Sequence, residues 1–98
     1  MGVQSQKRLM RELRKEAGRW LRELREKRGL SQRELANKVG IEPYSLIAQL
    51  EHGRGFIPQD RYLVWADALE IERGEFARRL TSYYDPKTCK NGHSLVKA

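Results

Sequence analysis

Apolar residues recur every three or four positions along most of the chain, a spacing that is typical of amphipathic helices. The clearest case begins after Ser31, whose side chain is placed to cap the start of a helix, with Glu34 completing a capping box. Gly40 predicts the end of this helix, because glycine readily adopts the left-handed conformation of a C-terminal cap. We therefore expect a helix over residues 32–39. Its apolar positions are Leu35, Ala36 and Val39.

A second helix is predicted directly after a short turn. Pro43 is tolerated in the first turn of a helix, so the Glu42-Pro43 pair marks its start, and we expect it to run to about His52. Ile47 and Leu50 are three positions apart and are expected to face inward. The outward positions carry mostly small or amide-bearing side chains, which suit close approach to the edges of DNA bases. They are Tyr44, Ser45, Ala48 and Gln49.

Helical spacing continues on both sides of this pair, so the chain is predicted to be all-α. The N-terminal segment fits either one long helix or two helices broken at Gly18, and a last helix is expected over about 72–84. A helix over about 60–69 is predicted in between, and Phe56 or Ile57 before it is expected to fill the core. The inward positions of that helix are Tyr62, Leu63, Ala66 and Leu69, with Trp65 able to share their face.

The two central helices and their turn resemble the lambda-repressor/Cro-type family of bacterial and phage regulators, also called the Xre family. The resemblance covers roughly residues 20–80. Its matching points are the L-S-Q-R-E-L-A run from Leu30, Gly40-Ile41 at the turn, the L-E-x-G ending at Leu50, Glu51 and Gly53, and Pro58. The chain has one residue more than is usual between the turn glycine and that ending. The resemblance implies a five-helix, lambda-repressor-like helix-turn-helix domain over residues 19–84, with a helical extension over 1–18 and a tail over 85–98.

The resemblance also assigns roles to individual residues. It implies that Gln32 contacts a DNA phosphate and that the outward residues of the second central helix lie in the major groove. It further implies that Glu51 is held by a basic residue of the first helix, for which Arg25 is the best candidate. The other backbone contacts expected in this domain are Arg33, Arg54 and Arg61.

The net charge of +7 and the isoelectric point near 9.9 indicate a polyanionic partner. Residues 1–28 hold ten Lys and Arg against four Glu, a net charge of +6, whereas residues 29–84 are nearly neutral. The basic residues of the N-terminal segment collect opposite its leucines, and three of them are expected to contact the DNA backbone: Arg11, Lys15 and Arg22. The alternatives for this face are a merely solvated surface and a helix that pairs two protomers.

Several classes of protein are excluded or disfavoured by what the chain contains. No apolar run is long enough to span a bilayer, so we expect no membrane partner and a cytoplasmic, nucleoid-associated location. Cys89 and His93 lack the further ligands that a structural zinc requires, so no metal and no cofactor are expected. Because no nucleophile has a local base and no glycine-rich phosphate loop is present, the chain is not expected to be an enzyme.

These patterns predict a sequence-specific transcriptional regulator that binds double-stranded DNA. A single domain of this size reads too few base pairs to select one genomic site, so we expect a homodimer on a palindromic operator, acting as a repressor. One alternative is an antitoxin-like protein-interaction module, whose tail after Asp85 folds onto a protein partner. Another is an RNA-binding protein that uses the basic helix.

Overall fold

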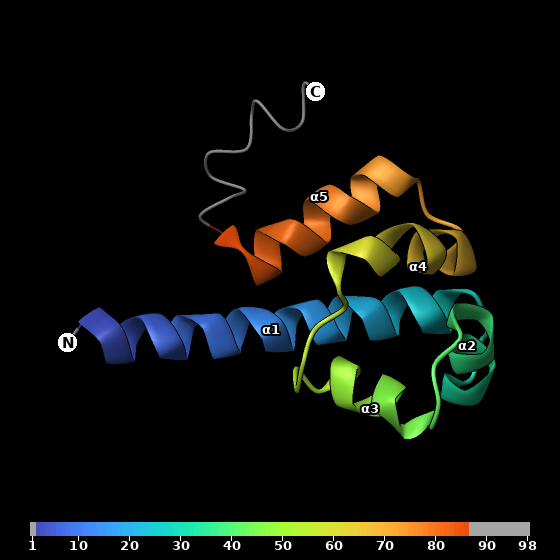
Figure 1. Ribbon diagram of the computed structural model, residues 1–98, viewed down its shortest axis with the longest axis horizontal. Coiled ribbons are helices and arrows are strands. Elements are labelled where there is room, and N and C mark those ends of the chain that lie inside the picture. Colours follow the sequence, from blue (N-terminus) through green and yellow to red (C-terminus); the bar gives the residue numbers. More distant parts are fainter. Residues whose placement is uncertain (1, 87–98) are drawn as a thin grey trace.

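The computed structural model describes residues 2–86 of the chain, and these residues form helices without strands. Helix α1 crosses the whole molecule, with α3 packed on one side of it and α4 and α5 on the other (Figure 1). Helix α2 closes the end of the molecule at which α1 finishes (Figure 1). The elements are α1 (Gly2–Lys27), α2 (Gln32–Val39), α3 (Ser45–Glu51), the short 3₁₀ helix η1 (Gln59–Arg61), α4 (Tyr62–Leu69) and α5 (Arg73–Tyr84).

Helix α1 is continuous through Gly18, so one long helix, rather than two, forms the N-terminal part of the chain. The glycine is there for close packing. A Cβ atom built on Gly18 would overlap the carbonyl oxygen of Glu51 and would lie 2.7 Å from that of Leu50. The absence of a side chain therefore lets α1 touch the backbone at the end of α3.

The boundaries of α2 are those predicted from its caps. The Ser31 hydroxyl accepts from the Glu34 amide at 3.0 Å, and the Glu34 carboxylate accepts from the Ser31 amide at 2.8 Å. These hydrogen bonds hold the pKa of Glu34 below its ordinary value, because they favour the charged carboxylate. At the other end Gly40 has a φ of 72°, and its amide donates to Ala36, which closes the helix.

Helix α3 begins at Ser45, so the predicted start at Glu42-Pro43 is wrong by about three residues. Pro43 and Tyr44 instead form a turn, in which the amides of Leu46 and Ile47 donate back to their carbonyls at 3.0 Å. These bonds span three residues rather than four, so the chain tightens here before the regular helix starts.

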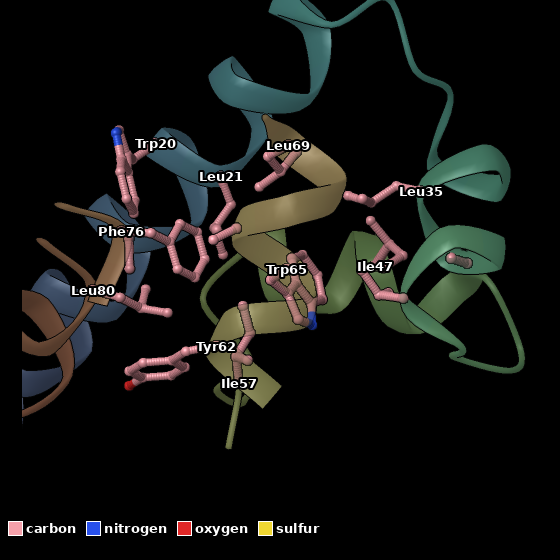
Figure 2. Close-up of a cluster of buried hydrophobic side chains, with 14 residues drawn as sticks. Trp20, Leu21, Leu35, Ile47, Ile57, Tyr62, Trp65, Leu69, Phe76 and Leu80 are labelled. Carbon is pink, nitrogen blue, oxygen red and sulfur yellow. The ribbon is translucent and has the colours of Figure 1, made fainter. Parts of the chain in front are cut away.

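A single apolar core holds the helices together (Figure 2). Trp20 and Phe76 stack at one end of it with ring centroids 5.5 Å apart, and Leu35 and Ile47 lie at the other end. Trp65 lies between them and is almost fully buried. The remaining fully buried large side chains come from several helices and from the loop before η1: Leu21, Val39, Ile57, Leu69 and Leu80.

Two predictions about this core needed the structure. Leu63 was expected to face inward but is 52% exposed, because Trp65 takes the inward position on α4. The buried residues of α4 recur at the spacing of one helical stripe, to which Trp65 belongs and Leu63 does not, and burying the larger indole removes more apolar surface from water. Ile57, rather than Phe56, fills the core, since Phe56 remains exposed.

Candidate DNA-binding surface

The outward face of α3 is centred on Ser45 and Gln49, which are both exposed. Ala48 is half-buried at the edge of this face. Leu46 is 37% exposed and borders the same face on its other side, beside an open hollow lined by α3, the 54–58 loop and the start of α4. The sequence interpretation missed Leu46. Its position three residues before Gln49 was the signal that places both on one side of a helix.

A buried ion pair holds the back of α3 in place. The Arg25 Nε and Nη2 atoms donate to the two carboxylate oxygens of Glu51 at 2.6 and 3.1 Å, and both side chains are at least nine-tenths buried. This is the partnership that the resemblance implied. The hydrogen bonds to Glu51 raise the pKa of Arg25, because they favour the charged guanidinium.

The same ion pair also ties in the other helices. Arg25 Nη1 donates to the carbonyl oxygen of Leu30 at 2.8 Å, just before α2. The Gln32 side-chain amide donates to Glu51 at 3.1 Å, so this residue, expected at a DNA phosphate, makes a contact within the protein instead of pointing freely outward. Three helices therefore meet at one carboxylate, and α3 is held rigidly against α1 and α2.

At the start of α3, Arg33 lies over the ring of Tyr44, with the guanidinium carbon 4.6 Å from the ring centroid. Arg33 is in the first turn of α2, and Tyr44 directly precedes Ser45. Both side chains are exposed. The contact places a cation beside the first residues of the outward face.

Beyond the end of α3 the chain passes very close to α1. A Cβ atom on Gly53 would lie 2.9 Å from the backbone of Lys15, and Gly53 has a φ of 80°. Only glycine fits such a position without strain. The following residue, Arg54, is exposed, so the close approach brings it near the basic residues of α1 around Lys15.

The loop after Arg54 is fastened across α1 by aromatic contacts. The Arg14 guanidinium lies 5.3 Å from the centroid of the Phe56 ring, and that ring meets Tyr84 of α5 edge to face at 6.0 Å. The Tyr84 hydroxyl accepts from the Ile57 amide at 3.3 Å. Burial raises the pKa of Tyr84 to about 12, because the ionised phenolate would be poorly solvated there.

The basic face of α1 is partly as expected. Arg11, Lys15 and Arg22 are exposed, and two of them have acidic neighbours: Lys15 lies 3.8 Å from Glu12 and Arg22 lies 3.1 Å from Glu26. Exposed pairs of this kind are weak enough to open when a phosphate competes for the cation.

Three other residues of α1 are placed differently from the sequence interpretation. The basic residues of α1 were expected on the face opposite the leucines, but Arg14 is half-buried beneath the loop that carries Phe56, and Arg25 is buried in its pair with Glu51. Leu9, expected on the apolar stripe, is exposed. The stripe is covered only where other elements pack on it, so a regular pattern does not guarantee burial at the end of a long helix.

Arg61 is also engaged within the protein. Its Nη2 atom donates to the carbonyl oxygen of Val39 at 2.8 Å, at the C-terminal end of α2, where a cation complements the helix dipole. His52 makes a comparable local contact, with its Nδ1 atom 2.7 Å from the carbonyl oxygen of Ala48. Arg33 and Arg54 flank the two ends of α3 and are exposed.

Within residues 2–86, no three His, Cys, Asp or Glu side chains come together as a metal site would need. Cys89, His93 and most of the proposed tail lie outside the described residues. None of the helices described is both long enough and apolar enough to cross a membrane.

An α2–turn–α3 pair with a rigidly held second helix and an outward face of small and amide side chains defines a helix-turn-helix unit. The comparison with known families agrees with this geometry. A family described as "Helix-turn-helix domain" matches residues 18–79, so the chain belongs to this family of Xre/Cro-like regulators. No curated protein and no solved structure gave a significant match.

Proposed function

We propose that the protein is a sequence-specific transcriptional regulator that inserts α3 into the major groove of double-stranded DNA. The observation that carries this proposal is the contrast between the two sides of α3. Its back is fixed by the buried Arg25–Glu51 pair, whereas its front presents Ser45 and Gln49 to solvent. A fixed backbone with free polar side chains on one face is what reading of base edges requires.

Base readout is assigned to the front of α3. The Gln49 amide can donate and accept at once, which matches the two hydrogen-bonding atoms that adenine presents in the major groove. Ser45 suits either a donor or an acceptor on a base. The half-buried Ala48 and the exposed Leu46 offer apolar contacts for a thymine methyl group, and Leu46 extends further from the helix.

Backbone contacts are assigned to cations on both sides of α3. Arg33 lies at its start and Arg54 follows its end, and Gln32 and Arg61 retain further donors beyond those used within the protein. Arg11, Lys15 and Arg22 extend this charge along α1. Such contacts supply affinity and register without regard to sequence.

The proposed regulator binds a palindromic operator as a homodimer. It represses transcription by occluding a promoter. One α3 helix contacts only a few base pairs, each worth about 1–3 kcal/mol of discrimination, so two copies are needed to select a genomic site. The exposed apolar side chains Phe56, Leu63 and Val64, on the loop and on α4, provide surface that a second copy can bury.

The decisive experiment is selection of a random duplex library by the purified protein at near-physiological salt, followed by sequencing. We expect an inverted repeat with half-sites about one helical turn apart. The variant Gln49→Ala should relax the preference at one position of each half-site, whereas Gln59→Ala, the same change on η1, should not. Retention of DNA without an enriched motif, or preferential binding of RNA hairpins, would contradict the proposal.

A further inference from the structure

Among the described arginines that stack on an aromatic ring, Arg33 is set apart by being both exposed and without a side-chain hydrogen bond, whereas Arg14, which also lacks one, is half-buried against Phe56. Arg79 also stacks on aromatic rings, those of Trp20 and Tyr83, but its Nε atom donates to the Tyr83 hydroxyl at 3.1 Å. In the part of the chain that the structure describes, Arg33 makes no ion pair and no side-chain hydrogen bond, and its contact is the face of the Tyr44 ring. The donors of Arg33 are oriented by the ring but remain unused.

We infer that Tyr44 is a positioning residue, whose ring holds the Arg33 guanidinium so that it donates to a DNA backbone phosphate beside the start of α3. This inference rests on the proposed function, because it assumes that α3 lies in the major groove. It changes the role that the sequence interpretation gave to Tyr44, from reading a base to orienting a cation.

The chemistry of stacking supports this division of roles. A guanidinium that lies over a ring uses its face for the contact, while its five N–H groups point outward in its own plane. Two of these N–H groups can bind a phosphate in the bidentate manner that arginine favours. Tyr44 is 44% exposed and Arg33 is exposed as well, so the guanidinium can be reached from solvent.

Orientation of the arginine matters because its side chain is long. An arginine on an exposed helix samples many rotamers, and immobilising such a side chain on binding costs about 0.5–1.5 kcal/mol. The ring of Tyr44 restricts Arg33 before DNA arrives. The contact also links Arg33, in the first turn of α2, to Tyr44, directly before α3. The position of the phosphate contact is therefore fixed relative to the outward face of α3.

The test uses fluorescent duplexes of about 20 base pairs, one with the motif enriched by selection and one of scrambled sequence, titrated at several salt concentrations. Arg33→Gln and Tyr44→Leu should each weaken binding to both duplexes by about tenfold, the scale of one hydrogen bond to a charged group. Each should also lower the slope of log K against log salt by about 0.9, the value for one phosphate. Tyr44→Phe, which keeps the ring, should leave both quantities unchanged.

Two further variants complete the design. The double variant Arg33→Gln/Tyr44→Leu should be no weaker than either single variant, since both remove the same contact. Arg79→Gln removes a stacked arginine from α5 and serves as the control for charge alone. Circular dichroism and thermal unfolding of every variant show whether the fold is retained, which the exposure of both residues leads us to expect.

The possible failures are distinguishable. If wild-type protein binds neither duplex, the proposed function is overturned, and this inference with it. If the wild type binds but Arg33→Gln behaves like Arg79→Gln, the inference is wrong while the function stands. A change of sequence preference in Tyr44→Phe would show that the phenol hydroxyl reads a base, and would return Tyr44 to the reading face.

Discussion

Gly18 of α1 lies against the main-chain carbonyl of Glu51 at the end of α3, so closely that a methyl group has no room between them. The same Glu51 carries the carboxylate that binds Arg25, seven positions further along α1. One residue of α3 is therefore fixed to α1 twice, by its backbone and by its side chain. The orientation of α3 relative to α1 depends on both contacts.

The variant Gly18→Ala should be destabilising and should weaken DNA binding. The added methyl group must push α1 away from α3, and overpacking of this kind costs about 1–3 kcal/mol. Gly74→Ala on α5 is the matched control, since its Cβ would meet the side-chain ends of Arg78 and of the capping Glu72 rather than backbone atoms. We expect that control to change the free energy of unfolding by less than about 1 kcal/mol. Urea denaturation of both variants measures the difference, and equal stabilities would contradict the role given to Gly18.

Glu51→Ala should lower the free energy of unfolding by about 3–5 kcal/mol, because it leaves the buried Arg25 guanidinium without its carboxylate. The matched control is Asp67→Ala, which breaks a pair of similar geometry with Arg73 at 2.7 and 3.0 Å. That pair is more than half exposed, so its loss should cost less than about 1 kcal/mol. Comparable losses in chemical denaturation would show that burial does not distinguish the two pairs.

Removing the exposed cations of α1 should weaken binding to all duplexes alike. Arg11→Ala combined with Lys15→Ala is expected to reduce the salt slope by up to about 1.8, twice the value for one phosphate. Arg73→Ala combined with Arg78→Ala removes the same charge from α5, on the opposite side of α1 from α3 (Figure 1). If both double variants lose affinity equally, the basic face of α1 acts only through net charge.

Stability should decrease in alkali as Tyr84 titrates. In the folded protein its pKa is raised to about 12 from 10.0, so between these values the unfolded chain has lost a proton that the folded protein keeps. Its contribution to stability is therefore complete below about pH 10 and is lost as pH rises towards 12. Tyr84→Phe should flatten this decrease in urea denaturation curves. The tyrosinate absorbance of the wild type should show a late-titrating group that the variant lacks.

Features that depend on a few neighbouring residues, such as the ends of helices, were predicted well from the sequence. The capping box of Ser31 and Glu34 and the left-handed Gly40 are set by a few adjacent positions, so both ends of α2 were correct. The members of the Arg25–Glu51 pair lie far apart in the chain, so local patterns do not predict it, and only the family resemblance did. The match to the helix-turn-helix family agrees with that resemblance.

Some features were missed or only partly predicted. Leu63 was placed on the inward face of α4, although Tyr62, Trp65, Ala66 and Leu69 recur at the regular spacing of a buried helical stripe and Leu63 does not. The phosphate contacts of Gln32 and Arg61 stay predictions, but their hydrogen bonds to Glu51 and Val39 arise from packing between helices and were not predicted. The exposure of Leu46, by contrast, could have been predicted, since it lies three residues before Gln49 on one side of the same helix.

The unbroken course of α1 has a mechanical consequence for the N-terminal cations. Because one rigid rod connects the core to the basic segment, the direction in which Arg11 points is set by helical phase, counted from Gly18. Inserting one residue between them would rotate the preceding segment by about 100° and shift it by about 1.5 Å. Seven inserted residues would nearly restore the original direction at a greater distance. The number of residues between Gly18 and the N-terminal cations therefore fixes the direction in which these cations project from the protein.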